Sequence, residues 1–130
     1  MKVELRDSTG QLISDNFYWR AAPDHPDDFA ALNTLPKVTL DMAVSRADQD
    51  GKCLLNVKLS NPTQSVALMA HVQLRRRGSG QRVLPVYYSD NYLSLLPGES
   101  RTISIEAAAK DLGGEEPVVA LDGWNVTSRI

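Results

Sequence analysis

The sequence has few of the residue types on which most enzymes and nucleic-acid-binding proteins depend. Its 130 residues include one cysteine and two histidines, and acidic residues outnumber basic ones by 16 to 14. A single cysteine excludes an internal disulfide. The net charge of −2 argues against nucleic acid as a partner, because proteins that bind nucleic acid usually carry a strong basic excess.

Long apolar segments are also missing. No apolar run approaches the roughly 20 residues that span a bilayer, so we expect no membrane partner. The first residues alternate charged and apolar side chains and lack the apolar centre of a signal peptide. This segment therefore carries no targeting signal that the sequence reveals.

No motif of a known catalytic centre is present. The sequence has no glycine-rich phosphate loop, no zinc-ligand spacing and no serine nucleophile elbow. Glycoside hydrolysis requires two carboxylates at a set separation, but the acidic residues here are scattered over turns. The adjacent Glu115 and Glu116 would point to opposite faces of an extended chain. We expect no catalytic residue, no metal site and no cofactor, and hence a chain that is not an enzyme by itself.

Three reactive or charged features have ordinary structural interpretations. Cys53 falls on the apolar side of an alternating run, which predicts a buried thiol. His71 falls on the polar side of another run, which predicts a surface histidine rather than a metal ligand. A basic run, residues 75–77 with Arg82, surrounds a Gly-Ser-Gly sequence and predicts a charged hairpin tip; phosphate binding is the less favoured alternative.

Alternation of apolar and polar residues is the main pattern that is present. The alternating stretches are residues 38–45, 53–60, 66–75, 83–88, 92–96, 101–107 and 118–122. In the third stretch, Val66, Leu68 and Ala70 are expected to share the buried face. About seven short strands separated by turn signals predict an all-β fold, an immunoglobulin-like antiparallel β-sandwich. Pro97 followed by Gly98 predicts a type II turn, and residues 48–51 predict another turn.

The chain is expected to have three parts. Residues 1–22 predict a hairpin outside the sandwich, residues 23–36 form a proline-rich linker loop, and residues 37–130 form the sandwich. An isolated hairpin is only marginally stable in water, and open strand edges recruit partners. We therefore expect the hairpin to fold back on the sandwich or to mediate self-association with another copy of the chain.

Aromatic residues gather in two places that could bind another molecule. Tyr87, Tyr88 and Tyr92 surround a turn that contains Asp90 and Asn91. The other aromatic candidates are Phe17, Tyr18 and Trp19, together with Trp124. They suit either packing or contact with a sugar ring. Packing or interdomain contact is favoured over carbohydrate binding, because aromatic anchors are common at protein interfaces.

Short segments along almost the whole chain resemble a known family. They are SDNFYW (residues 14–19), FAALNTLP (29–36), SNPT (60–63), SDNY (89–92), LPGE (96–99) and GWNV (123–126). Together and in this order they resemble the C-terminal region of family 2 glycoside hydrolases, in particular exo-β-D-glucosaminidases and the related β-mannosidases.

That resemblance implies a domain within a larger enzyme. The similar enzymes consist of a jelly roll, an immunoglobulin-like sandwich, a TIM barrel with both catalytic glutamates, and two further sandwiches. Residues 14–19 resemble the last hairpin of the fourth domain, and residues 35–126 resemble the fifth. Because this chain has no barrel, no catalytic residue is carried over to it.

The role that the resemblance implies is that of an accessory sandwich beside the TIM barrel. A loop of such a sandwich could wall the substrate cleft or contact another domain, and the candidates are Asp90, Asn91, Tyr92 and Tyr88. The expected partners are then the other domains of the parent glycosidase, chiefly the barrel, and an oligosaccharide. The parent would be a periplasmic or secreted bacterial enzyme. Two alternatives stay open: a free-standing carbohydrate-binding module that uses the tyrosine and tryptophan patches, and a spacer or protein-interaction sandwich.

Overall fold

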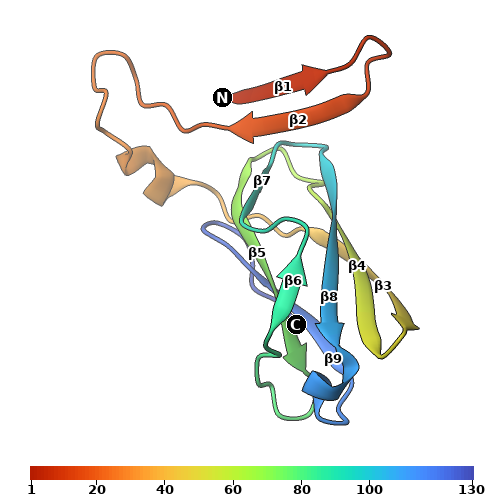
Figure 1. Ribbon diagram of the computed structural model, residues 1–130. Coiled ribbons are helices and arrows are strands. Elements are labelled where there is room, and N and C mark those ends of the chain that lie inside the picture. Colours follow the sequence, from red (N-terminus) through yellow and green to blue (C-terminus); the bar gives the residue numbers. More distant parts are fainter. The chain divides into compact units, whose positions relative to one another are not determined.

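The computed structural model describes all 130 residues and divides them into two compact units, residues 1–35 and residues 36–130. The smaller unit is an antiparallel ribbon of β1 (Lys2–Arg6) and β2 (Leu12–Phe17), followed by the short 3-10 helix η1 (Ala30–Thr34) (Figure 1). The turn of the ribbon is closed by Asp7, whose Oδ1 accepts hydrogen bonds from the backbone N–H groups of Thr9 and Gln11.

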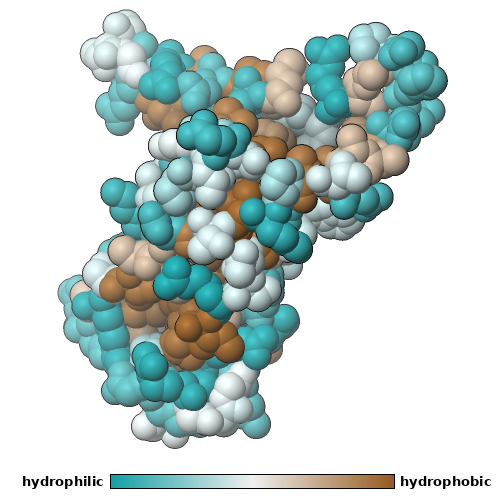
Figure 2. All heavy atoms as spheres, turned by 180° about the vertical axis from the view of Figure 1, so that it is seen from behind, coloured by the Kyte–Doolittle hydropathy of each residue, from teal (hydrophilic) through white to brown (hydrophobic).

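The ribbon has no second layer of its own. Val3, Leu5 and Ile13 are 49%, 59% and 61% exposed, although strands normally bury such side chains. Figure 2 shows apolar side chains, in brown, reaching the surface of the molecule between hydrophilic ones in teal. A two-stranded ribbon that leaves its apolar residues in water is a poor independent unit.

The larger unit is a sandwich of two antiparallel sheets (Figure 1). Its strands are β3 (Asp41–Gln49), β4 (Lys52–Ser60), β5 (Ala67–Arg76), β6 (Val86–Tyr88), β7 (Leu93–Leu95), β8 (Ser100–Ala108) and β9 (Pro117–Asp122), with the 3-10 helix η2 (Ala109–Leu112) after β8. The large sheet has the order β3-β4-β8-β6 and the small sheet the order β7-β5-β9. The predicted immunoglobulin-like, all-β sandwich is confirmed.

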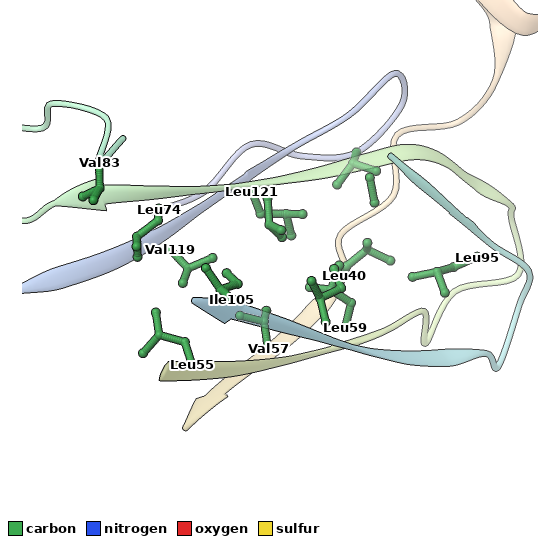
Figure 3. Packing of buried hydrophobic residues seen from close by; sticks show 14 of the residues in the cluster. Leu40, Leu55, Val57, Leu59, Leu74, Val83, Leu95, Ile105, Val119 and Leu121 are labelled. Carbon is green, nitrogen blue, oxygen red and sulfur yellow. The ribbon is translucent and has the colours of Figure 1, made fainter. Parts of the chain in front are cut away.

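The core lies between the two sheets, where alternate residues of facing strands meet. Figure 3 shows Leu55, Val57 and Leu59 of β4 pointing toward Leu74 of β5 and Leu121 of β9. Each such side chain contributes about 1.5–3 kcal/mol through its removal from water. Cys53 is fully buried in the same cluster, as its position in the β4 pattern predicts. This burial raises the pKa of the thiol and keeps it protonated.

Both predicted turns form, and one is tighter than predicted. Glu99 N–H donates to the carbonyl of Leu96 at 3.0 Å, and Gly98 has a φ of 79°, which confirms the type II turn. The β3–β4 loop contains only Asp50 and Gly51, with φ values of 53° and 74°. Two positive φ angles define a type I′ hairpin, whose twist suits the flanking strands. As a result β3 continues to residue 49 and does not end at residue 45.

Strand β3 also begins later than predicted. Val38 and Leu40, which the alternation assigned to this strand, precede it, and both are fully buried. Val38 forms a parallel bridge with Val126 near the end of the chain. The two residues are therefore core residues, as their apolar character suggests, but they lie outside the ladder of the large sheet.

A β-bulge changes which residues of β5 face the core. The pairing of β5 with β7 shifts register between Ala67 and Ala70, and Met69 adopts a φ of 54°. Ala67 and Ala70 consequently both lie in the core cluster, whereas Leu68 is buried outside it. The prediction that Val66, Leu68 and Ala70 share one face is wrong, because the extra residue of a bulge reverses the alternation.

Two buried asparagines connect loops that are distant in sequence. Asn61 donates its side-chain amide to the carbonyls of Ser65 and Leu95, and its backbone pairs with the 96–99 turn. Asn125 accepts from Leu68 N–H at 2.8 Å and donates to the carbonyl oxygen of Pro36 at 2.9 Å. Three of the segments that carry the resemblance, those at residues 60–63, 96–99 and 123–126, thus hold the loops of the sandwich in place.

Candidate functional site

Residues 89–92, here called the crossing segment, lead the chain from one sheet to the other. Ser89 still belongs to the large sheet, because its N–H donates to the carbonyl of Ser104 and its Oγ accepts from Ser104 N–H, both at 2.9 Å. Strand β7, in the small sheet, begins immediately after the segment. The predicted binding loop is therefore also the connection between the two layers.

Asn91 completes the edge of β5 with its side chain. Strand β7 has three residues and β5 has ten, so β7 leaves part of that edge unpaired. Asn91 Oδ1 accepts from Val72 N–H at 2.9 Å, and its Nδ2 donates to the Val72 carbonyl at 3.0 Å. A side-chain amide here replaces the backbone of a missing strand residue and satisfies both polar groups of a buried residue.

Tyr88 also satisfies a backbone group of β5, two residues beyond Val72. Its phenol oxygen accepts from Leu74 N–H at 2.9 Å, and the Leu74 carbonyl accepts from Val83 N–H at 3.0 Å. Burial raises the pKa of the Tyr88 phenol, so the ring remains neutral at physiological pH. Asn91 and Tyr88, both predicted as cleft or contact residues, are therefore fixed in the framework of the sandwich.

Asp90 and Tyr92 remain at the surface of the crossing segment. The Asp90 carboxylate is exposed and accepts only from the N–H of Asn91, at 2.8 Å. Tyr92 is 59% exposed and has a φ of 56°. Its ring stacks on the imidazole of His71, with centroids 4.4 Å apart and planes 5° apart. These two residues are the part of the predicted cleft group that is free to contact another molecule.

The other predicted aromatics belong to different units of the structure. Phe17, Tyr18 and Trp19 lie at the end of the ribbon, where Phe17 is half-buried and the other two are 50% and 42% exposed. Trp124 follows β9 in the sandwich and is 48% exposed. Each aromatic presents a large apolar surface that suits an interface.

A second cluster, which sequence analysis did not identify, lies on the outer face of the small sheet and is called here the small-sheet network. His71 Nδ1 lies 2.9 Å from Asp122 Oδ1, and Gln73 Nε2 donates to Asp122 Oδ2 at 3.0 Å. Arg75 and Arg82 both donate to Gln73 Oε1, at 2.8 and 3.0 Å. The alternation of His71, Gln73 and Arg75 along β5 was the available signal, because alternate residues share one face.

A shallow hollow of about 390 Å³ lies on the outer face of the large sheet. Leu54, Glu106 and Tyr87 form a cross-strand row there, and the Tyr87 side chain is 70% exposed. The only carboxylate that lines the hollow, Glu106, pairs with Lys52 Nζ at 2.6 Å. A single, ion-paired carboxylate does not provide the acid and nucleophile that glycoside hydrolysis requires.

The remaining acidic groups act in the framework. Glu115 accepts from the N–H groups of Gly78 and Ser79, and Glu116 pairs with Arg46 at 2.5 Å, so the two neighbours diverge as extended geometry requires. No three His, Cys, Asp or Glu side chains are close enough to hold a metal ion. None of the short helices has the length and apolar content of a membrane span.

These features define the class as an immunoglobulin-like β-sandwich domain whose polar clusters largely serve its own framework. Residues 16–126 match the family described as the exo-β-D-glucosaminidase Ig-fold domain. The chain belongs to this family, and the resemblance to exo-β-D-glucosaminidases read from the sequence is confirmed.

Individual relatives agree with that assignment. The chain is 32% identical to an exo-β-D-glucosaminidase of Streptomyces avermitilis, over 98% of this chain and 16% of the relative. It superposes on the crystal structure of the exo-chitosanase CsxA of Amycolatopsis orientalis with a TM-score of 0.87 and 28% identity, covering 98% of this chain and 17% of the other. A mannosylglycoprotein endo-β-mannosidase of Lilium longiflorum is 54% identical over 44 residues, 34% of the chain. The chain thus spans about a sixth of the length of the Streptomyces and Amycolatopsis proteins, and its match to the lily enzyme covers 4% of that relative.

Proposed function

We propose that the chain is a non-catalytic accessory domain of a larger family 2 exo-glycosidase of the exo-β-D-glucosaminidase type, and that it packs beside the catalytic TIM barrel. One observation carries the proposal: 98% of the chain aligns with an exo-β-D-glucosaminidase, yet it accounts for only 16% of that enzyme. The carboxylates of the chain support the same conclusion. Glu106 pairs with Lys52, and Glu115 and Glu116 bind different groups.

The crossing segment would then contribute to the wall of the substrate cleft or to an interdomain contact. Asp90 and Tyr92 are the residues that could do so directly, since both are exposed. Asn91 and Tyr88 would act through the framework, by holding the segment against β5. Substitution of Asp90 or Tyr92 should change the KM of the parent enzyme without unfolding the sandwich.

The ribbon at residues 1–22 would complete a preceding sandwich domain, with residues 23–36 as the linker. Its exposed Val3, Leu5 and Ile13 support this proposal, because they would find a second layer in that domain. Without that layer the isolated chain should self-associate through the ribbon. Light scattering should detect a dimer of the chain that becomes a monomer when residues 1–22 are deleted; a strictly monomeric chain would contradict this.

Activity measurements test the main proposal. The purified 130-residue chain should release no aryl alcohol from aryl β-D-glucosaminides or aryl β-D-mannosides. The polypeptide that contains the chain should hydrolyse the glucosaminide, and cell fractionation should find it in the periplasm or the medium of a bacterial culture. Hydrolysis by the chain alone would contradict the accessory role.

A second candidate is a carbohydrate-binding module, favoured by the hollow beside Tyr87. An exposed tyrosine ring next to the polar groups of Glu106 and Asn56 could stack on a sugar and hydrogen-bond its hydroxyls. Titration calorimetry of the chain with chitosan and mannan fragments tests this candidate. Heat that disappears in Tyr87→Ala would support it, and the absence of heat at millimolar sugar would count against it.

A further inference from the structure

The outer faces of the two sheets differ in chemistry. On the large sheet short polar side chains pair with one another, as Ser104 does with Asn56 at 3.0 Å and Ser60 with Ser100 at 2.8 Å. On the small sheet the outward residues of β5 have long or cyclic polar side chains: His71, Gln73 and Arg75 lie opposite Asp122, Ala120 and Val118 of β9.

The small-sheet face is partly closed to water even in the isolated chain. Gln73 and Ala120 are paired across β5 and β9, and although they point outward they are only 7% and 8% exposed. A hollow of about 360 Å³ opens beside them, lined also by Arg75, Asp122 and Arg129. The face therefore has a dry centre surrounded by charged side chains, just as protein interfaces combine a buried centre with a polar rim.

Two guanidinium groups on this face lack a carboxylate. Arg75 and Arg82 share one neutral acceptor, Gln73 Oε1, and Arg75 also donates to the carbonyl oxygen of Gly80 at 3.0 Å. All of these acceptors are uncharged. Arg75 Nε is buried without any hydrogen-bond partner. Asp122, the carboxylate of the network, already accepts from Gln73 and pairs with His71. Guanidinium groups favour carboxylates as partners, so a second carboxylate would balance the two positive charges that the chain leaves without an ion pair.

An aromatic anchor stands beside these cations. Tyr92 stacks on His71, which pairs across the strands with Asp122, so the ring is held in one orientation at the rim of the network. Tyrosine and arginine are the residue types that most often carry binding energy at interfaces. A tyrosine whose rotamer is already fixed also loses little entropy when a partner covers it.

We propose that the outer face of the small sheet is the docking face of this domain, and that it receives a carboxylate-bearing segment of the parent glycosidase between Arg75 and Arg82 while Tyr92 is covered. This docking face rests on the proposed function, because its occupant is the polypeptide outside these 130 residues. The S. avermitilis relative is about six times as long as this chain, which is 16% of its length. Covalent connection places such a partner at a high effective concentration, so a modest interface suffices.

Hydroxyl-radical footprinting with residue-level mass spectrometry tests the docking face. Tyr92 and Tyr87, 59% and 70% exposed on opposite outer faces, should both oxidise readily in the 130-residue chain. In the intact parent polypeptide the oxidation of Tyr92 should slow by about tenfold, because interface centres exclude water. Tyr87 is the internal control and should keep its rate within about twofold.

Charge reversal at Arg82 tests whether the docked segment carries a carboxylate. Arg82→Glu removes one guanidinium and gives Arg75 an acceptor within the chain, so Tyr92 oxidation in the intact polypeptide should return toward the rate of the free chain. Lys58→Glu, on the exposed outer face of β4, is the matched control and should leave Tyr92 protected. Circular dichroism of both variants in the 130-residue chain verifies that the sandwich is folded.

The outcomes separate this proposal from the function on which it rests. Protection of Tyr87 with Tyr92 unchanged, or equal effects of the two charge reversals, overturns the docking face. If the parent hydrolyses aryl glucosaminides but Tyr92 is unprotected, only the docking face fails. If the parent polypeptide contains no glycosidase, both proposals fail.

Discussion

Replacing Asn91 distinguishes a framework residue from a ligand-binding one. Asn91→Ala removes the acceptor for Val72 N–H and the donor to the Val72 carbonyl, bonds of 2.9 and 3.0 Å to a fully buried residue. An unsatisfied buried polar group costs about 1–3 kcal/mol. Because Asn91 is only half-buried, water can reach part of the vacated space, so we expect a loss of about 2–3 kcal/mol for the pair.

That loss is large for a domain of this size. Small domains have a free energy of unfolding of about 5–15 kcal/mol, and the variant should melt about 10–20 °C lower than the original chain. Urea denaturation followed by circular dichroism gives the difference in free energy of unfolding. The slope of that free energy against urea concentration should be unchanged, because the same surface is exposed on unfolding.

Two matched variants make the prediction specific to the edge of β5. Asp90→Ala alters the neighbouring exposed side chain and should change the free energy of unfolding by no more than about 0.5 kcal/mol. Asn91→Asp keeps the acceptor but places an oxygen against the Val72 carbonyl, so it should be about as destabilising as alanine. If Asn91→Ala is as mild as Asp90→Ala, Asn91 does not hold the edge of β5.

Three other substitutions test neighbouring parts of the account. Asn125→Ala removes hydrogen bonds to three backbone groups from a residue that is 2% exposed, and urea denaturation should show a loss of about 3–5 kcal/mol; a loss below 1 kcal/mol would contradict its role. Tyr88→Phe removes only the acceptor of Leu74 N–H and should cost about 1 kcal/mol. Hydrogen bonds from Ser79 and Gly78 lower the pKa of Glu115, so its stabilisation is complete above the unfolded-state pKa and is lost as pH falls through the lower folded-state pKa. Glu115→Gln should therefore be less stable than the original at pH 7 and equal to it in strong acid; a pH-independent difference would contradict this.

The strands were predictable because β-sheet alternation is a local property of the chain. Leu55, Val57 and Leu59 face the core as their spacing predicts, and Cys53 follows the same rule. The bulge in β5 could not be predicted, since nothing in the composition around Met69 indicates a positive φ. The extra residue reverses the alternation at the bulge, so the residues before it face opposite to the prediction whereas Ala70, Val72 and Leu74 face the core as predicted. The spacing of apolar residues predicts which side chains face the core only where the strand pairing is free of bulges.

The roles of the crossing segment depend on contacts distant in sequence. Turn formers and tyrosines are expected both in binding loops and in structural connections, so Asn91 and Tyr88 fitted a ligand-binding interpretation equally well. The framework contacts follow from the length mismatch of β5 and β7, which leaves buried backbone groups of Val72 and Leu74 to be satisfied. The small-sheet network was missed for a similar reason: Arg82 and Asp122 reach Gln73 from other segments.

The central claim is that this sandwich is an accessory domain within a larger exo-glycosidase. Determining the reading frame on both sides of the segment that encodes these 130 residues tests it most directly. The account predicts several hundred upstream codons that encode a TIM barrel with two catalytic glutamates, in frame with this domain. A frame that encodes only this chain, or that joins it to a protein without a glycosidase barrel, would contradict the account.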